Sequence, residues 1–196
     1  LIGFAPMQTF SKSLNNESDI KISLAQWSLN KSIKSGELPI LDFAKKARSF
    51  DINAIEYVAS LYTEHSDVLD RMPMSSLAKE LLKRSDDYGI DNFLFMIDGQ
   101  GDLASSRKKI RLEAIENHKR WIDFSFTIGC KTMRVNLRGE DNLNRWTENS
   151  VKSLSVLSNY NKNLNVVVEN HGDLSSNGKY LANVMSKVNI DNCGTL

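Results

Sequence analysis

From residue 20 onward, the chain alternates between short apolar runs and longer stretches in which apolar residues recur every three or four positions. The short runs predict β-strands and the longer stretches predict α-helices. Strands are expected at residues 20–28, 54–59, 92–97, 132–137, 164–169 and near 193. Helices are expected at residues 38–50, 75–88, 107–126, 148–161 and 180–188. The expected apolar face of the helix at 107–126 is made of Ile110, Ala114, Ile115, Trp121, Ile122 and Phe126.

Strands and helices follow one another without a hairpin signal, which predicts parallel pairing through right-handed crossovers and therefore an α/β fold. Successive strands begin about 34 residues apart, so eight such units would need roughly 270 residues, close to the size of a (β/α)8 barrel. The 196 residues of this chain then correspond to about five to six units. A doubly wound open sheet of this length would be complete, so length alone favours the open sheet.

Polar side chains at the carboxyl ends of four successive strands favour the barrel instead. Alternation along each strand puts these side chains on one face of it. A barrel gathers such groups at one rim, whereas an open sheet binds ligands at a single switch point. We therefore expect residues 20–196 to form an incomplete (β/α)8 TIM barrel of about five to six βα units. The rim residues are Glu56, Asp98, Arg134, Asn136, Glu169 and His171.

Glu169 and His171 form the strongest pair of candidate catalytic residues. Two positions apart on a strand, they point the same way, with roughly 6–7 Å between their Cα atoms. A carboxylate and an imidazole at that spacing suit a divalent metal or an acid–base pair acting on a substrate between them. The alternative is a structural glutamate in a salt bridge at the start of a loop.

Arg134 and Asn136 could bind a phosphate, a carboxylate or sugar hydroxyls, since a guanidinium offers a rigid fork of donors. The alternative is a polar layer inside the barrel that pairs with neighbouring carboxylates such as Glu56 or Glu169. Asp98 opens the sequence Asp-Gly-Gln-Gly at residues 98–101, where the glycines permit tight turns and close approach of a ligand. The segment has neither a Walker lysine nor the G-x-G-x-x-G spacing.

The other two histidines and the cysteines fit structural roles. His118 lies on the apolar face of the helix at 107–126 and is interpreted as a core histidine rather than a ligand. His65 follows the second strand and is interpreted as a solvated loop residue. Cys130 and Cys193 are isolated from each other in the sequence, so neither a disulfide framework nor a zinc ribbon is expected.

The charge balance excludes a general affinity for polyanions. Lys and Arg number 25 and Asp and Glu number 24, which gives a net charge of +1. There is thus no global electrostatic case for nucleic acid or an anionic membrane surface. No window approaches the roughly 20 apolar residues that span a bilayer.

The two ends of the chain differ from the rest. Residues 1–7 are apolar and precede a segment rich in Ser, Asn and Lys at 11–19. Residues 1–19 therefore fit either the remnant of an export signal with a linker, or a leader on a cytoplasmic protein. Periplasmic and cytoplasmic locations both stay open. Residues 192–196 read as a strand that is cut off, so the chain is expected to be incomplete.

Six segments together resemble the sugar phosphate isomerase/epimerase family, the xylose isomerase-like TIM barrels that also include endonuclease IV-type enzymes. The resemblance covers residues 20–196 and depends on the order and spacing of the segments. They are residues 22–28 (ISLAQWS), 54–58 (AIEYV), 96–101 (MIDGQG), 116–123 (ENHKRWID), 129–136 (GCKTMRVN) and 168–172 (VENHG).

The resemblance implies a divalent cation at the carboxyl rim, often manganese, with magnesium, zinc and cobalt as the alternatives. It assigns Glu169 as the first metal ligand and His171 as a position beside it that serves the substrate. The other ligands are expected beyond residue 196: an aspartate on the sixth strand, a histidine after it and a glutamate on the eighth strand. Residues 194–196 look like the run just before that aspartate.

The implied activity is isomerisation or epimerisation of a sugar or sugar phosphate by metal-assisted proton transfer next to a carbonyl. Glu169 and His171 would be catalytic, and Arg134, Asn136, Glu56 and Asp98 would bind the substrate. The alternatives are a lyase or hydrolase on keto-sugar glycosides, an endonuclease IV-like enzyme and a non-catalytic carbohydrate-binding remnant. A small carbohydrate is the expected partner, nucleic acid is not expected, and a homo-oligomer stays open.

Overall fold

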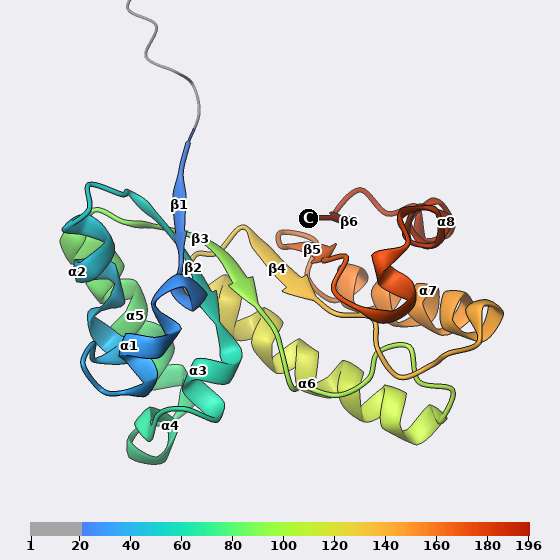
Figure 1. Ribbon diagram of the computed structural model, residues 1–196, viewed down its shortest axis with the longest axis horizontal. Helices are drawn as coiled ribbons and strands as arrows, with labels where there is room; N and C mark the ends of the chain where they lie inside the picture. Colours follow the sequence, from blue (N-terminus) through green and yellow to red (C-terminus); the bar gives the residue numbers. More distant parts are fainter. Residues whose placement is uncertain (1–20) are drawn as a thin grey trace, which may run out of the picture.

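The computed structural model describes residues 21–196, in which six parallel strands alternate with helices (Figure 1). The leader expected at residues 1–19 lies outside the described residues. The predicted alternation of strands and helices is confirmed. The strands are β1 (Ser23–Ala25), β2 (Ala54–Val58), β3 (Asp91–Met96), β4 (Thr132–Val135), β5 (Asn165–Val168) and β6 (Cys193–Thr195).

Five longer helices match the predicted ones, and several short helical turns were not predicted. The α-helices are α1 (Asn30–Lys34), α2 (Phe43–Arg48), α3 (Ala59–Thr63), α4 (Val68–Arg71), α5 (Met74–Tyr88), α6 (Lys108–Thr127), α7 (Leu143–Tyr160) and α8 (Gly178–Val188). The 3-10 turns are η1 (Gln26–Leu29), η2 (Ile40–Asp42) and η3 (Asp173–Ser176). Within residues 21–196 no helix combines the length and the apolar character that a bilayer crossing requires.

The strand order decides between the two α/β architectures. The strands lie side by side in the order of the chain, from β1 to β6, and every neighbouring pair is parallel. A doubly wound sheet reverses its order at a switch point and carries helices on both faces. Because the order never reverses here, right-handed crossovers place the helices on one face. This is the wall of a (β/α)8 barrel, so the incomplete barrel is confirmed although length alone favoured an open sheet.

The register of the sheet separates a helix-facing row from a row on the concave face. The helix-facing row is completely or almost completely buried at Tyr57, Phe95, Met133 and Val166. Phe95 stacks on Trp121 of α6 with 5.2 Å between ring centroids. The concave row consists of Val58, Met96, Arg134, Val167 and Gly194. Arg134 therefore points away from the helices.

Two details of the predicted elements are wrong. The first strand ends at Ala25 rather than at residue 28, because the buried amide of Gln26 bonds to Tyr62 Oη at 3.0 Å and to Val58 N at 3.1 Å. On α6, Phe126 is 49% exposed and Phe124 is buried in its place. Phe126 lies five residues after Trp121, about 140° around the helix, whereas Phe124 lies only about 60° away.

Gly101 fixes the loop between β3 and α6 against the helix. Its φ is +98°, and a Cβ added there would lie 2.9 Å from Ala114 Cβ and 3.2 Å from Ala114 Cα. Gly36 has a similar φ of +77° with no atom within 4 Å of the added Cβ. The two glycines therefore share the same backbone requirement, but only Gly101 also lies against a helix.

We expect Gly101→Ala to lower the free energy of unfolding by about 2–4 kcal/mol, because left-handed strain and a clash with α6 add together. Gly36→Ala should cost about 1–2 kcal/mol, because it meets only the backbone strain. Denaturant titration of both variants measures the difference. Equal losses would show that the loop does not press on α6.

Candidate functional site

The carboxyl ends of β3, β4 and β5 bring four of the predicted side chains together on the concave face. Arg134 lies in β4, Asn136 follows it, Asp98 follows β3 and Glu169 follows β5. Parallel bonding continues past the strand ends, since Ile97 N donates to Arg134 O at 2.8 Å and Glu169 N to Val135 O at 3.4 Å. Parallel pairing therefore aligns the ends of these strands at one rim.

The guanidinium of Arg134 lies between two carboxylates. Its Nη1 is 2.8 Å from Asp98 Oδ1, and its Nε is 3.0 Å from Glu169 Oε2. The Arg134 side chain is 7% exposed, whereas those of Asp98 and Glu169 are 34% and 30% exposed. A planar cation with donors along two edges can hold two carboxylates at once. Arg134 thus fixes Asp98 and Glu169 relative to each other; pairing with Glu169 was one of the expected alternatives, whereas the partner Asp98 was not predicted.

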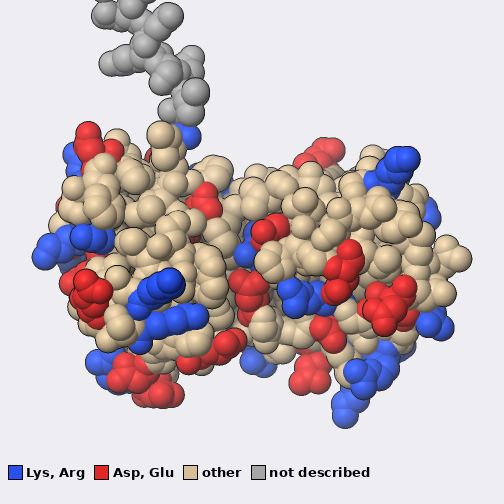
Figure 2. Space-filling model, viewed as in Figure 1, with Lys and Arg blue, Asp and Glu red and all other residues tan. Residues whose placement is uncertain are grey.

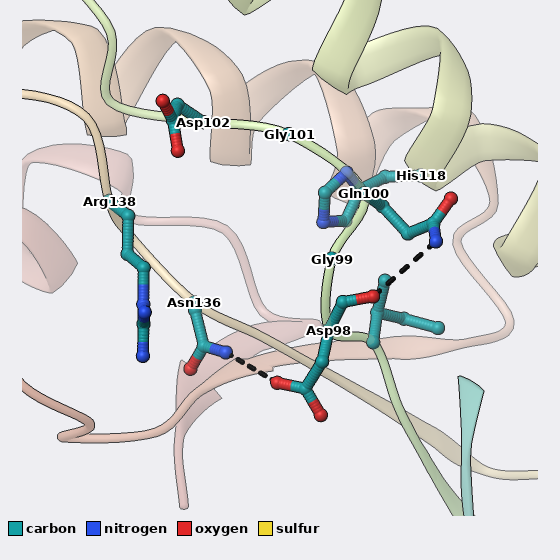
Figure 3. Close-up of a pocket in the computed structure, with 9 residues that line it drawn as sticks. Asp98, Gly99, Gln100, Gly101, Asp102, His118, Asn136 and Arg138 are labelled. Carbon is teal, nitrogen blue, oxygen red and sulfur yellow. Dashed lines mark hydrogen bonds between the residues drawn. The ribbon is translucent and has the colours of Figure 1, made fainter. Parts of the chain in front are cut away.

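Asn136 completes the cluster from the loop after β4. Its Nδ2 donates to Asp98 Oδ1 at 2.8 Å (Figure 3). Its Oδ1 is buried and has no hydrogen-bond partner among the described residues. Arg134 and Asn136 therefore both converge on Asp98, and direct contact of either with a sugar remains a prediction.

Glu169 and His171 lie side by side, as their spacing predicted. His171 Nδ1 is 3.4 Å from Glu169 Oε1, at the long limit of a hydrogen bond, and its side chain is 53% exposed. The turn is tight, because His171 N donates to Glu169 O at 2.8 Å and Gly172 follows with φ +75°. The imidazole is thus held beside the carboxylate but remains open to a ligand.

The rim encloses a cavity of about 510 Å³, here called the mouth cavity. One part of its wall is apolar, with Val58 and Met96. Another part carries the charged and imidazole groups Asp98, Arg134, Glu169 and His171. The volume lies within the roughly 300–1,000 Å³ of small-molecule sites. The mouth cavity can therefore hold a small polar ligand against an apolar wall.

Three residues of the mouth cavity were missed or interpreted differently from the sequence. Trp27, which is 48% exposed, and Glu64 line it without having been predicted. His65, interpreted as a solvated loop residue, is exposed but also lines the cavity. No clear signal in the sequence pointed to Trp27, because the predicted strand at residues 20–28 included it, whereas β1 ends at Ala25. Glu56 is not among the lining residues; it accepts a hydrogen bond from Ser23 Oγ, two positions before Val58 on the same face.

A second cavity of about 430 Å³ also has Asp98 in its lining (Figure 3). It is here called the His118 cavity. Among its lining residues are Asp98, Gln100, Asp102, His118, Asn136 and Arg138. His118 is 2% exposed, so its expected burial is confirmed. Its ring nevertheless lines a polar cavity, which the interpretation as a core residue did not anticipate.

Burial lowers the pKa of His118 from its usual 6.5 to about 4. The backbone bond to Ala114 O and the charge of Asp98 oppose this effect only in part. His118 is therefore a neutral imidazole at pH 7.

The described residues do not form a complete divalent-cation site. Among residues 21–196, no three side chains of His, Cys, Asp or Glu come together as ligands for a metal. The guanidinium of Arg134 lies within 3.0 Å of both rim carboxylates, and its positive charge opposes a cation there. Glu169 and His171 supply part of a donor set only.

The sequence matches no protein-family model and no curated protein sequence. The fold is similar to that of D-psicose 3-epimerase, solved in the presence of D-fructose, with a TM-score of 0.68 and 13% identity over 90% of this chain and 62% of the epimerase. It is similar to that of the IolI protein with a bound zinc atom, with a TM-score of 0.68 and 16% identity over 90% and 62% of the two chains. For L-ribulose 3-epimerase the TM-score is 0.69 and the identity 17%, over 89% and 59%.

These similarities confirm the fold, an incomplete (β/α)8 barrel like those of the epimerases just named. The chain spans 62% of the length of D-psicose 3-epimerase. At such low identities a shared fold does not fix the reaction, since one barrel supports many activities. The chemistry has to be argued from the residues at the rim.

We expect Arg134→Met to lower the free energy of unfolding by about 2–4 kcal/mol, because two partly buried carboxylates lose their counter-charge. Arg134→Lys retains the charge without the fork and should cost less. Denaturant titration at pH 7 compares the two variants. The bridge is refuted if the methionine variant is as stable as the lysine variant.

Acid should destabilise the protein through His118. The unfolded chain binds a proton to this imidazole below pH 6.5, whereas the folded chain resists it down to about pH 4. Stability is therefore lost as the pH falls through that window, by up to about 3 kcal/mol.

His118→Phe should remove this part of the acid sensitivity, measured as unfolding free energies at pH 7 and pH 4.5. The control, His65→Phe, removes an exposed imidazole and should retain the acid sensitivity. If the His118 variant loses as much stability in acid as the unaltered protein, His118 does not resist protonation in the folded state.

Proposed function

We propose that this chain acts in the metal-dependent isomerisation or epimerisation of a small carbohydrate, by proton transfer at a carbon next to a carbonyl. The observation that carries the proposal is the cluster at the barrel rim, where Arg134 holds Asp98 and Glu169 beside the exposed His171. The likeness in fold to two sugar 3-epimerases supports a sugar as the substrate.

We assign Glu169 as the group that removes the proton from the substrate and returns it. Its carboxylate is 30% exposed and lines the mouth cavity, so it can reach a bound ligand. A positioned carboxylate can remove a proton from a carbon that an adjacent carbonyl acidifies, and can return it to the same or the neighbouring carbon. His171 could donate a hydrogen bond to a substrate oxygen beside the reacting carbon.

Arg134 acts as a positioning residue in this proposal. It is 7% exposed; its Nη1 donates a hydrogen bond to Asp98, and its Nε forms an ion pair with Glu169 at 3.0 Å without a hydrogen bond. Asp98, which Arg134 and Asn136 hold, would accept hydrogen bonds from sugar hydroxyls. The apolar side chains of Val58 and Met96 give the C–H groups of a sugar ring a surface to pack on.

A divalent cation, when bound, would polarise the substrate carbonyl and stabilise the developing negative charge. Glu169 is the ligand we assign to it from this chain, and its other ligands would have to come from outside residues 21–196. Manganese is the cation we propose, with zinc, magnesium and cobalt as alternatives. The IolI structure, which contains a zinc atom, supports a cation on this type of fold.

A carbohydrate fits the surface better than DNA does. Lys and Arg alternate with Asp and Glu over the face drawn in Figure 2, without a continuous basic stripe. The net charge of +1 agrees with this distribution. A nuclease would need a basic surface to bind the phosphate backbone.

The test is exchange of the proton next to the carbonyl of a ketose in deuterated water with manganese, followed by NMR. We expect deuterium incorporation and formation of the epimer, both abolished by a chelator. Glu169→Gln should slow the exchange about 10²–10⁴-fold, the usual contribution of a general base.

The control variant is Glu148→Gln, which removes a carboxylate from α7 that is 65% exposed and should leave exchange unchanged. Cleavage of a keto-sugar glycoside without exchange would favour the lyase or hydrolase alternative. Product formation only on abasic DNA would favour the endonuclease alternative. Retention of a sugar without turnover or bound metal would identify a binding protein.

A further inference from the structure

The His118 cavity is a separate compartment that meets the mouth cavity at one residue. Asp98 lines both cavities, and it accepts a hydrogen bond at 2.8 Å from Nδ2 of Asn136, which lines the His118 cavity. Figure 3 shows this pair below the cavity, with His118 above and Arg138 to one side. A ligand that passes Asp98 would therefore touch both compartments.

His118 presents an unoccupied hydrogen-bond acceptor to this cavity. Its Nδ1 lies 2.7 Å from Ala114 O, and because a carbonyl can only accept, Nδ1 must carry the hydrogen. Nε2 is then a bare acceptor, and it makes no hydrogen bond within residues 21–196. Figure 3 shows the ring reaching from α6 toward the cavity. An acceptor of this kind in a cavity wall favours a ligand that brings a donor.

The charges around the cavity nearly balance. Arg134 compensates Asp98 at 2.8 Å, which leaves Asp102 and Arg138 as one negative and one positive charge. A phosphate would meet the guanidinium of Arg138, but also the carboxylates of Asp98 and Asp102 and the bare Nε2 of His118, none of which can donate to it. A cation would meet the guanidinium of Arg138 in the cavity wall, and Arg134 already compensates Asp98. An uncharged ligand with several hydroxyls can donate to His118 and Asp102 and accept from Arg138.

We propose that the His118 cavity binds an uncharged, hydroxyl-rich ring of the substrate, so that the substrate is an unphosphorylated glycosyl ketose rather than a sugar phosphate. The ketose part would occupy the mouth cavity, and the second ring would pass Asp98 to reach His118. This inference rests on the proposed function for its assignment of the ketose to the mouth cavity. The two cavities, of about 510 and 430 Å³, each have room for a sugar ring.

Calorimetric titration of the full chain with three probes tests the proposal. D-Fructose carries no substituent, isomaltulose carries a neutral glucosyl group on O6, and D-fructose 6-phosphate carries a phosphate on the same oxygen. We expect isomaltulose to bind about 10-fold more tightly than fructose, the effect of one or two added hydrogen bonds. Fructose 6-phosphate should bind no more tightly than fructose. A preference for the phosphate, or none for isomaltulose, overturns the proposal.

Variants of the cavity locate the preference. His118→Phe retains the shape of the ring and should remove most of the 10-fold advantage of isomaltulose while leaving fructose binding unchanged. Arg138→Met changes an exposed residue, so it should fold normally and lower isomaltulose binding in the same direction. Lys152→Met, on the exposed surface of α7, is the control and should bind all probes normally.

An NMR measurement on the unsubstituted protein tests the same contact without relying on variants that could fold poorly. In protein labelled with ¹⁵N-histidine, a hydroxyl donated to His118 should shift its Nε2 resonance when isomaltulose is added, and fructose should not do so. An unshifted resonance at saturating isomaltulose contradicts the assignment.

Failure of this inference and failure of the proposed function can be distinguished. Glu169→Gln should lose proton exchange but retain the preference for isomaltulose. A preference that depends on His118 in a protein without exchange would sink the proposed function and support the cavity assignment. Proton exchange on fructose without any preference for isomaltulose would support the proposed function and contradict the cavity assignment.

Discussion

The position of one guanidinium determines how the rim of this barrel is arranged. Arg134 lies between Asp98 and Glu169, at 2.8 and 3.0 Å, and so links the ends of β3, β4 and β5. Without a cation between them, two carboxylates on neighbouring strand ends would repel each other in a partly buried site. The side chain of Arg134 is almost fully buried, whereas the carboxylates of Asp98 and Glu169 are about one-third exposed, so solvent reaches the bridge only from the carboxylate side. The catalytic geometry we assign to Glu169 depends on this bridge.

Two cavities with different chemistry meet beside this bridge. On the side of Glu169 and His171, a carboxylate and an imidazole face the mouth cavity and can move a proton. On the side of His118, neutral acceptors and balanced charges suit recognition of hydroxyl groups. Asp98 belongs to both compartments. Recognition of one part of a substrate and reaction at another would then be coupled through a single residue.

The sequence predicted those features that follow from local periodicity. Alternation along β5 placed Val166 and Val168 in the core and Glu169 on the opposite face, and parallel pairing brought the strand ends together. Features that depend on distant residues were missed. The early end of β1 requires the contact of Gln26 with Tyr62, and the cavity beside His118 requires two loops that only the folded chain brings together. The pattern within one segment shows neither the contact between Gln26 and Tyr62 nor the meeting of the two loops.

The most direct measurement of the central claim is the sign of the stability change when a rim carboxylate is neutralised with and without Arg134. Unfolding free energies are needed for Asp98→Asn and Glu169→Gln in the unaltered protein and in Arg134→Met. If Arg134 bridges both carboxylates, each neutralisation should destabilise the unaltered protein, because an ion pair is lost. In the Arg134→Met protein, Asp98 and Glu169 repel each other, so neutralising either one should stabilise the fold. The same sign in both backgrounds would contradict the bridge and the site built on it.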